Sequence, residues 1–346
     1  MGRLGTVITQ TPFRISFFGG GTDFPSYFNE RGGAVLGTTI NKYLYVNVNS
    51  LERLLEKRIR LSYSNLEIVD QPEDLKHELV RQTLINHKEF MDGGFLDIHS
   101  FADLPNQSGV GSSSSFEVGF LNALYLLHGL YKLPKDLARE AILIEREQLG
   151  HHGGWQDQIH AAFGGLNKIS FAQNDFHVTP VCVPRDRLEA LETSCMFFFT
   201  GSVRSSTQVQ NSVFGKGEDI RLRTSKEVHL KRMLEMVDEG VKILSQAQGI
   251  KAMLAEFGAL LDEAWYCKRS FSSLVSNPTI DDIHEVAKRA GAYGGKLVGA
   301  GGGGFMLFVV PEDRRNKVIR ALSGLRQIHV RFEAQGSRAV FANQIS

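Results

Sequence analysis

Residues 105–115 read Pro-Asn-Gln-Ser-Gly-Val-Gly-Ser-Ser-Ser-Ser and lead directly into a predicted helix that extends to residue 131. The small residues allow the backbone to wrap around an anion, and the free amide groups at the helix start point toward it. We interpret this segment as a phosphate-binding loop whose serine hydroxyls also offer a ligand for Mg²⁺. The alternative interpretation is an ordinary loop with a serine-rich helix cap, because serine favours that position.

A second glycine cluster, Gly-Ala-Gly-Gly-Gly-Gly, occupies residues 299–304. It contains the spacing of the dinucleotide fingerprint, which requires a strand before it and a helix after it. Here a predicted strand, residues 305–310, follows the glycines, so the order excludes a dinucleotide-binding dehydrogenase. Four consecutive glycines indicate backbone that packs closely against a ligand or another loop.

A third cluster, Phe-Phe-Gly-Gly-Gly-Thr-Asp at residues 17–23, follows Arg14. A cation, a glycine turn and a carboxylate thus lie within ten positions. Taken alone, this pattern is equally consistent with a binding site and with a surface hairpin that carries an ion pair.

The fourth cluster extends from Glu145 to Asp157 and contains three glycines. On a predicted helix over residues 136–149, Glu145 shares an apolar stripe with three residues, Ala138, Ile142 and Leu149. A buried carboxylate is costly unless it is paired or metal-bound, so the stripe favours a functional role or, alternatively, a buried arginine partner. Asp157 lies at the start of a short predicted helix, residues 155–163.

The amino-acid composition indicates the number of domains and excludes some classes of binding partner. The 346 residues favour two domains, and 39 Lys and Arg against 38 Asp and Glu give a net charge of +1. That balance argues against nucleic acid and membrane surfaces as partners. Three cysteines and no apolar leader or long apolar run predict a cytoplasmic protein. Glycine, with 35 residues, is enriched, and the enrichment lies largely in clusters.

Strands and helices alternate without a regular βαβ repeat, which predicts an α+β fold. We expect helices over residues 73–91 and 312–324, and between residues 217 and 290 with breaks near 249 and 276–278. The expected strands are residues 6–18, 34–49, 58–70, 96–105, 164–171, 176–183, 195–200, 305–310, 329–334 and 338–343. We place the boundary between two domains near residue 190.

In combination, these motifs resemble the GHMP kinases, a family that includes galactokinase and mevalonate kinase. The three family motifs correspond to residues 12–27, 105–115 and 296–305, so the resemblance covers nearly the whole chain. It implies an N-terminal domain of the ribosomal-protein-S5 domain-2 type over residues 1–190. It also implies a ferredoxin-like C-terminal domain over residues 191–346, with ATP and a sugar between the two.

The resemblance also implies roles for individual residues. Asp157 corresponds to the family's catalytic base and Arg14 to the cation that pairs with it. Glu145 corresponds to the family's metal-binding glutamate, and Ser112 or Ser113 is implied to lie near Mg²⁺, with Ser113 taken as the ligand. The residues implied to bind ATP are Pro105, Ser108, Gly109, Val110, Gly111, Ser112, Ser113, Ser114 and Ser115.

Within the family, galactokinases carry Glu-His where this chain has Gly20 and Gly21, which disfavours galactose. Four segments instead resemble the heptose kinases: Gly-Gly-Gly-Thr-Asp at residues 19–23, Gly-Gly-Trp-Gln-Asp-Gln at residues 153–158, Thr200-Gly201 with Arg204, and Ser-Asn-Pro at residues 276–278. That resemblance implies phosphorylation of the anomeric hydroxyl of D-glycero-α-D-manno-heptose 7-phosphate to the 1,7-bisphosphate, on the route to GDP-heptose and cell-surface glycans such as lipopolysaccharide or capsule. The residues implied to bind this sugar phosphate are Gly20, Gly21, Thr22, Asp23, Lys168, Arg204, Gly301, Gly302 and Gly303.

A phosphorylated substrate also requires a site for its own phosphate. The candidates are Arg204 with Ser202, Ser205 and Ser206, and three further cations, Lys168, Lys268 and Arg269. For Lys268 and Arg269, solvated surface charge is the alternative. Two other functions stay open: a kinase similar to L-fucokinase that acts on an unphosphorylated sugar, and a non-catalytic sugar and ATP sensor.

Overall fold

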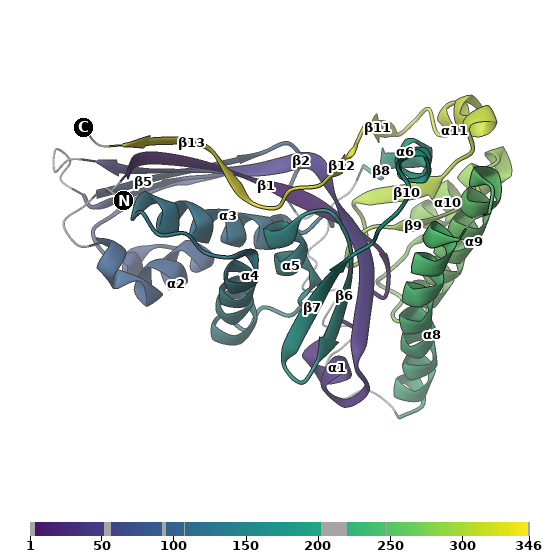
Figure 1. Ribbon diagram of the computed structural model, residues 1–346, viewed down its shortest axis with the longest axis horizontal. Coiled ribbons are helices and arrows are strands. Elements are labelled where there is room, and N and C mark those ends of the chain that lie inside the picture. The colour runs from purple at the N-terminus through teal and green to yellow at the C-terminus, as the bar shows by residue number, and fades with distance from the viewer. Residues whose placement is uncertain are drawn as a thin grey trace.

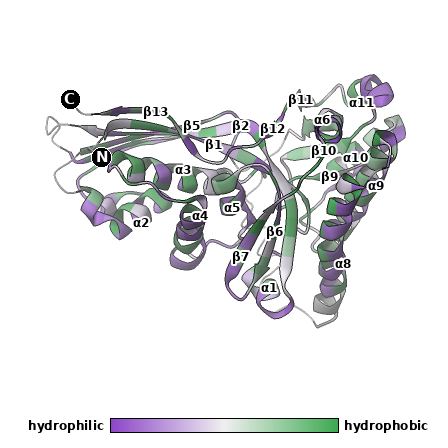
Figure 2. Cartoon of the chain, in the orientation of Figure 1, coloured by the Kyte–Doolittle hydropathy of each residue, from purple (hydrophilic) through white to green (hydrophobic). Residues whose placement is uncertain are grey.

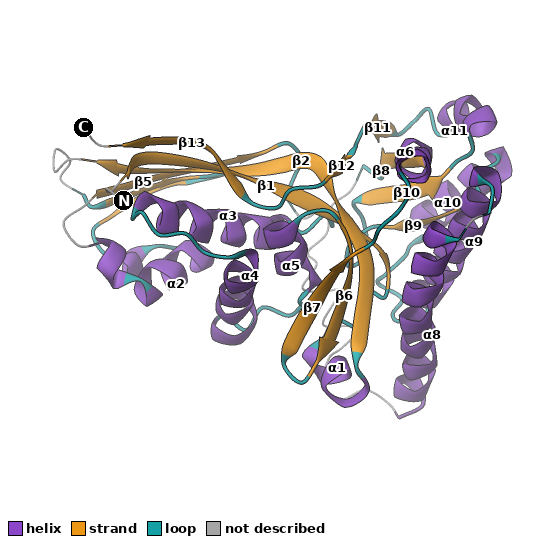
Figure 3. Ribbon diagram, in the orientation of Figure 1, coloured by secondary structure: helices purple, strands orange, loops and turns teal. Residues whose placement is uncertain are grey.

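Two long antiparallel strands, β1 (Leu4–Phe18) and β2 (Gly33–Leu51), form the centre of the first sheet in the computed structural model, which describes residues 4–51, 57–91, 95–106, 108–201, 220–246 and 248–344. Alternate residues of β1 are fully buried, as expected for a strand that packs one face on a core. Helices pack on this sheet and on a second one (Figures 1 and 3), so the predicted α+β class is confirmed.

The first sheet has the strand order β13-β1-β2-β5-β3-β4, and β2 also pairs with β6 and β12. The first part of β2 pairs with β6 and the later part with β5, so one long strand connects two regions of the sheet. The other strands of this sheet are β3 (Ile59–Ser62), β4 (Leu66–Val69), β5 (Phe95–Ala102), β6 (Leu166–Ala172), β7 (Asp175–Pro180), β12 (Phe332–Glu333) and β13 (Arg338–Gln344).

The helices α2 to α5 lie on one side of this sheet (Figure 1). The helix α3 is almost completely buried and packs on β1, where the Thr9 hydroxyl donates to the carbonyl of Gly119 at 2.8 Å. The helices of this part are α1 (Pro25–Arg31), α2 (Glu78–Asn86), α3 (Ser112–Leu127), α4 (Pro134–Ile142) and α5 (Gln156–Phe163), with a π-helical turn η3 (Leu143–Gln148) and short 3-10 turns η1 (Pro72–Asp74) and η2 (Lys88–Met91).

The second sheet is antiparallel with the order β11-β8-β10-β9. Its central strand β10 is buried at every position and is coloured hydrophobic in Figure 2, whereas the outlying α11 is largely hydrophilic. The elements are α6 (Arg185–Ser194), β8 (Cys195–Phe199), α8 (Ile220–Ser245), α9 (Ile250–Arg269), α10 (Pro278–Ala290), β9 (Gly294–Leu297), β10 (Phe305–Val309), η4 (Glu312–Arg314), α11 (Arg315–Ala321) and β11 (Arg326–Ile328).

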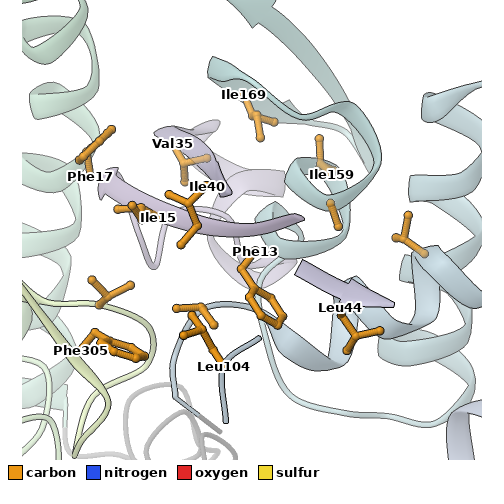
Figure 4. Close-up of a cluster of buried hydrophobic side chains, with 14 of the residues drawn as sticks. Phe13, Ile15, Phe17, Val35, Ile40, Leu44, Leu104, Ile159, Ile169 and Phe305 are labelled. Atoms are coloured by element: carbon orange, nitrogen blue, oxygen red, sulfur yellow. The ribbon is translucent and has the colours of Figure 1, made fainter. Parts of the chain in front are cut away.

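Aromatic side chains at the end of β1 connect the two sheets. The rings of Phe17 and Phe18 pack edge-on against Phe257 of α9, with centroid distances of 5.2 and 5.1 Å. Figure 4 shows Phe17 in a continuous apolar cluster that also includes Phe305 of β10. Such edge-to-face pairs add stability beyond the area they bury. The end of β1 is therefore held firmly against the second sheet.

The structure differs from the sequence expectations in several places. Residues 58–70 form the hairpin β3–β4 rather than one strand, and the expected helix over residues 136–149 is α4 followed by a π-helical turn. The elements α1, α6 and β9 were not predicted. The division at residue 190 stays a prediction, but β12 and β13 return from the C-terminal segment to the first sheet. In the part of the chain that is described, no helix is long and apolar enough to span a membrane.

One glycine contact fixes α9 against β9. A Cβ atom on Gly294 would lie 1.9 Å from the carbonyl oxygen of Gly258, and a Cβ on Gly258 would lie 2.5 Å from the Cβ of Tyr293. Backbone therefore meets backbone here, which only glycine permits.

We predict that Gly294→Ala lowers the free energy of unfolding by about 1–3 kcal/mol, because the clash is with main chain that cannot rotate away. The matched control is Gly324→Ala, since a Cβ at Gly324 meets nothing within 4 Å. Denaturation curves of the two variants and the parent chain measure the effect. Equal stability of all three would contradict the close contact.

Candidate active site

Arg14 and Asp157 form a two-pronged ion pair at the centre of the candidate site. Nε and Nη2 of Arg14, on β1, donate to the two carboxylate oxygens of Asp157, on α5, at 2.6 and 2.9 Å. The remaining nitrogen, Nη1, donates to the carbonyl of Gly109 at 2.7 Å. Arg14 is buried, whereas 19% of the Asp157 side chain is exposed. The guanidinium thus fixes the orientation of a carboxylate that still faces open space.

The loop before α3 reaches the same carboxylate. Gly109 and Gly111 have φ values of +84° and +82°, a region that glycine adopts without strain. Gly111 is the N-cap of α3, and because glycine has no side chain, the N-cap residue itself makes no capping hydrogen bond. A Cβ on Gly111 would lie 3.4 Å from the Asp157 carboxyl group. The positive end of α3, which can bind a phosphate, therefore lies next to Asp157.

The serine residues of this loop divide into different roles. The hydroxyls of Ser108 and Ser115 donate to backbone carbonyls at 2.7 and 3.1 Å, so they stabilise the loop itself. Ser113 and Ser114 instead donate to a carboxylate, that of Glu145. Among the residues predicted to bind ATP, Ser108, Val110, Ser114 and Ser115 are buried, whereas Pro105, Gly109, Gly111, Ser112 and Ser113 are at least partly exposed. The ATP-binding role of this set stays a prediction.

Glu145 is buried in the π-helical turn and accepts hydrogen bonds from three side chains. The donors are Ser113 at 2.9 Å, Ser114 at 2.8 Å and Nε2 of Gln158 at 2.5 Å. Nη1 of Arg146 lies 3.5 Å from the same carboxylate. Glu145 and Ser113, the two residues implied to bind Mg²⁺, thus lie side by side, and their metal-binding role stays a prediction.

The Glu145 carboxylate and the Ser113 hydroxyl are oxygen groups of the kind that Mg²⁺ binds. This ion binds through one or two carboxylates together with substrate phosphates and water, rather than through a cage of protein ligands. Within the described ranges, no three His, Cys, Asp or Glu side chains converge on one point. The Glu145 carboxylate with the Ser113 hydroxyl, beside the open end of α3, supplies the oxygen ligands that such a shared site requires.

Asp23 is held beside this pair by main-chain and side-chain amides. Its carboxylate accepts from the amide of Gly21 and from Nε2 of Gln156, both at 2.9 Å. Burial and the nearby Asp157 raise the pKa of Asp23. A Cβ on Gly154 would lie 1.9 Å from an Asp23 oxygen, so glycine is required there.

A pocket connects these groups and is bounded by both sheets. Gly20, Gly21 and Asp23, which the resemblance implies to bind substrate, line it, and their binding role stays a prediction. Its lining residues are Arg14, Ser16, Gly20, Gly21, Asp23, Phe24, Arg146, Gly154, Gln156, Asp157, Met233, Lys268, Phe271, Val275, Lys296, Gly299 and Ala300. Within the described chain this lining contains four Lys or Arg side chains and two carboxylates.

Several predicted substrate residues lie elsewhere. The Thr22 hydroxyl donates to the carbonyls of Gly19 and Ala34, which makes it a structural residue of the turn. Lys168 is outside the pocket lining and pairs with Asp238 of α8. Arg204, with Ser202, Ser205 and Ser206, lies outside the described residues. The binding roles of Thr22 and Lys168 remain predictions without support from the pocket, and the role of Arg204 stays a prediction.

The glycines of residues 301–303 are also absent from the pocket lining, although Gly299 and Ala300 belong to it. A Cβ on Gly299 would lie 2.3 Å from the Cα of Gly109, and a Cβ on Gly304 would lie 2.3 Å from the carbonyl of Ser108. The cluster thus packs against the loop before α3. Of the two interpretations offered by the sequence, contact with another loop is confirmed.

Three cationic residues of the pocket were missed or given too little weight. Arg146 and Lys296 were not proposed as site residues, and Lys268 was only one of several phosphate candidates. A lysine within a buried strand could have indicated Lys296, but β9 is only four residues long. Burial, together with the positive charge of Arg14, lowers the pKa of Lys296 to about 7. Burial, Lys296 and Arg14 lower the pKa of Lys268 as well.

Comparison with known proteins gives a consistent result. The model of the GHMP kinases N terminal domain matches residues 78–165, and the model of the GHMP kinases C terminal domain matches residues 250–325. The chain is similar to D-glycero-alpha-D-manno-heptose 7-phosphate kinase of Campylobacter jejuni, with 31% identity over 92% of this chain and 93% of that protein.

Two further relatives extend this comparison. The bifunctional fucokinase/GDP-fucose pyrophosphorylase of Arabidopsis thaliana is 27% identical over 90% of this chain and 30% of its own length. The crystal structure of a D-glycero-D-manno-heptose 1-phosphate kinase from Bacteroides thetaiotaomicron superposes with a TM-score of 0.76 and 26% identity, over 98% of this chain and 99% of that one. These likenesses confirm the resemblance and the two-domain fold deduced from the sequence. The chain belongs to the GHMP kinase family and is a sugar kinase, a phosphotransferase with an alcohol group as acceptor.

Proposed function

We propose that this kinase transfers the γ-phosphoryl group of ATP to the anomeric hydroxyl of D-glycero-α-D-manno-heptose 7-phosphate and releases the 1,7-bisphosphate and ADP. The observation that carries the proposal is the Asp157 carboxylate, oriented by Arg14 and adjacent to the open end of α3. The 31% identity to a heptose 7-phosphate kinase supports the choice of acceptor. The product would supply GDP-heptose for surface glycans, and we expect the reaction in the cytoplasm.

Different residues would bind the ATP phosphates, the acceptor hydroxyl and Mg²⁺. The loop of residues 105–111 and the amides at the start of α3 bind the ATP phosphates. Asp157 lies where it can orient the acceptor hydroxyl and take its proton as the new oxygen–phosphorus bond forms. Arg14 then stabilises the negative charge that develops on the acceptor oxygen as it loses its proton. In this arrangement Ser113 and Glu145 would hold Mg²⁺, which in kinases neutralises charge on the transferred phosphoryl group.

We assign sugar binding to the part of the pocket lining formed by Gly20, Gly21 and Asp23. Its carboxylate, although buried, belongs to the pocket lining and can accept a hydrogen bond from a sugar hydroxyl. Gly20 and Gly21 present backbone without side chains, which leaves room for a bulky acceptor. The excess of cations over carboxylates in the lining supports an acceptor that carries negative charge.

The proposal is tested with a panel of acceptors: D-glycero-D-manno-heptose 7-phosphate, the free heptose, mannose 6-phosphate and L-fucose. We expect ATP-dependent ADP release to be fastest with the heptose 7-phosphate, and ³¹P NMR to show a new anomeric phosphate. Faster turnover of L-fucose or of the free heptose would identify a kinase for unphosphorylated sugars. Absence of ADP release with every acceptor would point to a sensor.

We predict that Asp157→Asn lowers kcat by roughly 10²-fold or more, because the amide cannot take the acceptor proton. The dissociation constant for ATP should change little, since Asp157 is assigned to the acceptor. Steady-state kinetics and a nucleotide-binding titration measure both quantities. Asp238→Asn, an exposed carboxylate paired with Lys168, is the control and should retain parental kinetics. Parental kcat in Asp157→Asn would remove this residue from the chemistry.

A second prediction concerns the metal. Glu145→Gln should raise the Mg²⁺ concentration needed for half-maximal activity by roughly 10-fold or more, because an anionic ligand is replaced by a neutral one. The measurement is initial rate against free Mg²⁺ at saturating ATP, with thermal unfolding as a check on the fold. The control is Glu147→Gln, the same substitution at an exposed glutamate two residues from Glu145. An unchanged Mg²⁺ dependence would contradict the ligand role.

A further inference from the structure

Two lysines line the acceptor pocket from the side of the second sheet. Lys268 lies near the end of α9 and Lys296 lies in β9, and both are buried, with exposed fractions of 9% and 3%. Nζ of Lys296 donates to the carbonyl of Phe17 at 2.7 Å. Nζ of Lys268 donates to the carbonyls of Leu297, at 2.9 Å, and Gly299.

Within the described part of the chain, neither lysine pairs with a carboxylate. Of the two acidic residues in the pocket lining, Asp157 is engaged by Arg14, and Asp23 accepts from amide groups. Carbonyl oxygens satisfy ammonium hydrogens but carry no net charge. Two ammonium groups at the same pocket wall, close to a third cation, are unfavourable unless an anion binds among them.

The surroundings of the pair specify the kind of anion. The lysines leave Nζ hydrogens available beyond those given to carbonyls, because each ammonium group has three. Arg146 adds a guanidinium to the same lining; its partners among the described residues are carbonyl groups at 3.3–3.4 Å and the Glu145 carboxylate at 3.5 Å. Several cationic donors around one space match a phosphate group, which carries up to two negative charges and three acceptor oxygens.

We propose that Lys268 and Lys296 form a subsite for a phosphate group inside the acceptor pocket. This inference rests on the proposed function, because the phosphate belongs either to the acceptor sugar or to the group in transfer from ATP. Either source presents a phosphate group with the same charge and acceptor oxygens. The two buried lysines take the place of Lys168 and Arg269, which were also candidates for binding the substrate's phosphate. Arg269 pairs with Asp281 at 2.9 Å and does not line the pocket.

The first test measures binding without turnover. Inorganic phosphate is titrated into the parent chain and into Lys268→Gln and Lys296→Gln, which keep an amide donor but lose the charge. We expect each variant to bind phosphate roughly 10- to 100-fold more weakly, the range expected for a lost charged hydrogen bond. Arg269→Gln is the control and should bind like the parent. Equal phosphate affinity in parent, lysine variants and control would overturn the proposal.

A second readout covers the case in which a lysine variant fails to fold. With a pKa of about 7, Lys296 is largely neutral at pH 8 in the free protein. The charged groups around it in the pocket are Arg14 on β1, Lys268 on α9, Arg146 on η3, Asp157 on α5 and Asp23. A bound phosphate dianion favours the charged lysine, so the parent chain should take up protons on binding at pH 8. Calorimetry in buffers of different ionisation enthalpy measures this uptake, and binding without proton uptake would count against the subsite.

Kinetics then distinguish the two sources of phosphate. If the subsite holds the phosphate of the acceptor, the lysine variants raise KM for the sugar phosphate and leave the kinetics of the free sugar unchanged. If it holds the group in transfer, kcat falls for both acceptors with little change in either KM. A parent enzyme that binds inorganic phosphate through these lysines, yet phosphorylates only free sugars, would refute the proposed acceptor and not the subsite.

Discussion

The guanidinium of Arg14 is the interaction on which the site depends. It joins β1, the loop before α3 and α5, which are far apart in the sequence, through bonds to Asp157 and to the carbonyl of Gly109. Arginine suits this position because its planar fork contacts both carboxylate oxygens and keeps a further donor for the carbonyl. A lysine could not make this set of bonds in fixed directions. The position of Asp157 relative to the helix end therefore follows from one buried side chain.

Close backbone contacts impose the second constraint. The glycines around residues 299–304 allow a loop of the second sheet to pack directly on Ser108 and Gly109. Through this contact the lysines of α9 and β9 reach the same pocket as Arg14, since Lys268 donates to the carbonyl of Gly299. Glycine enrichment, which first indicated ligand-binding loops, thus also reflects the packing of loops on each other.

Sequence reasoning succeeded where the pattern is local. Alternation in β1 and β2 and the helical spacing before Glu145 depend on neighbours a few residues away, and these elements and the burial of Glu145 were predicted. The pairing of Arg14 with Asp157 was available only through the family resemblance, because 143 positions separate the two residues. The return of β12 and β13 to the first sheet depends on contacts as distant as those between residues 10 and 338.

Sequence reasoning missed Arg146 and Lys296 and gave Lys268 only as one of several phosphate candidates, each for a different physical reason. Lys296 follows two glycines in a four-residue strand, which is too short to display a period. Arg146 lies in a π-helical turn, where the wider helix changes which side chains share a face. The burial of Lys268 results from elements that meet only in the tertiary structure. Charge balance within a pocket is likewise a property of the assembled fold.

Two carboxylates share this pocket, and their surroundings distinguish their roles. Asp23 is almost fully buried and amides of the protein fix its orientation, so its remaining acceptor capacity suits one sugar hydroxyl in a defined direction. Asp157 keeps an exposed edge and lies beside the helix end that would bind the phosphates. Phosphoryl transfer passes through a loose transition state in which the acceptor proton leaves late, so a carboxylate held in place by arginine can both orient the acceptor hydroxyl and take its proton. The accessible carboxylate, rather than the one with the raised pKa, is therefore the better candidate for the catalytic residue.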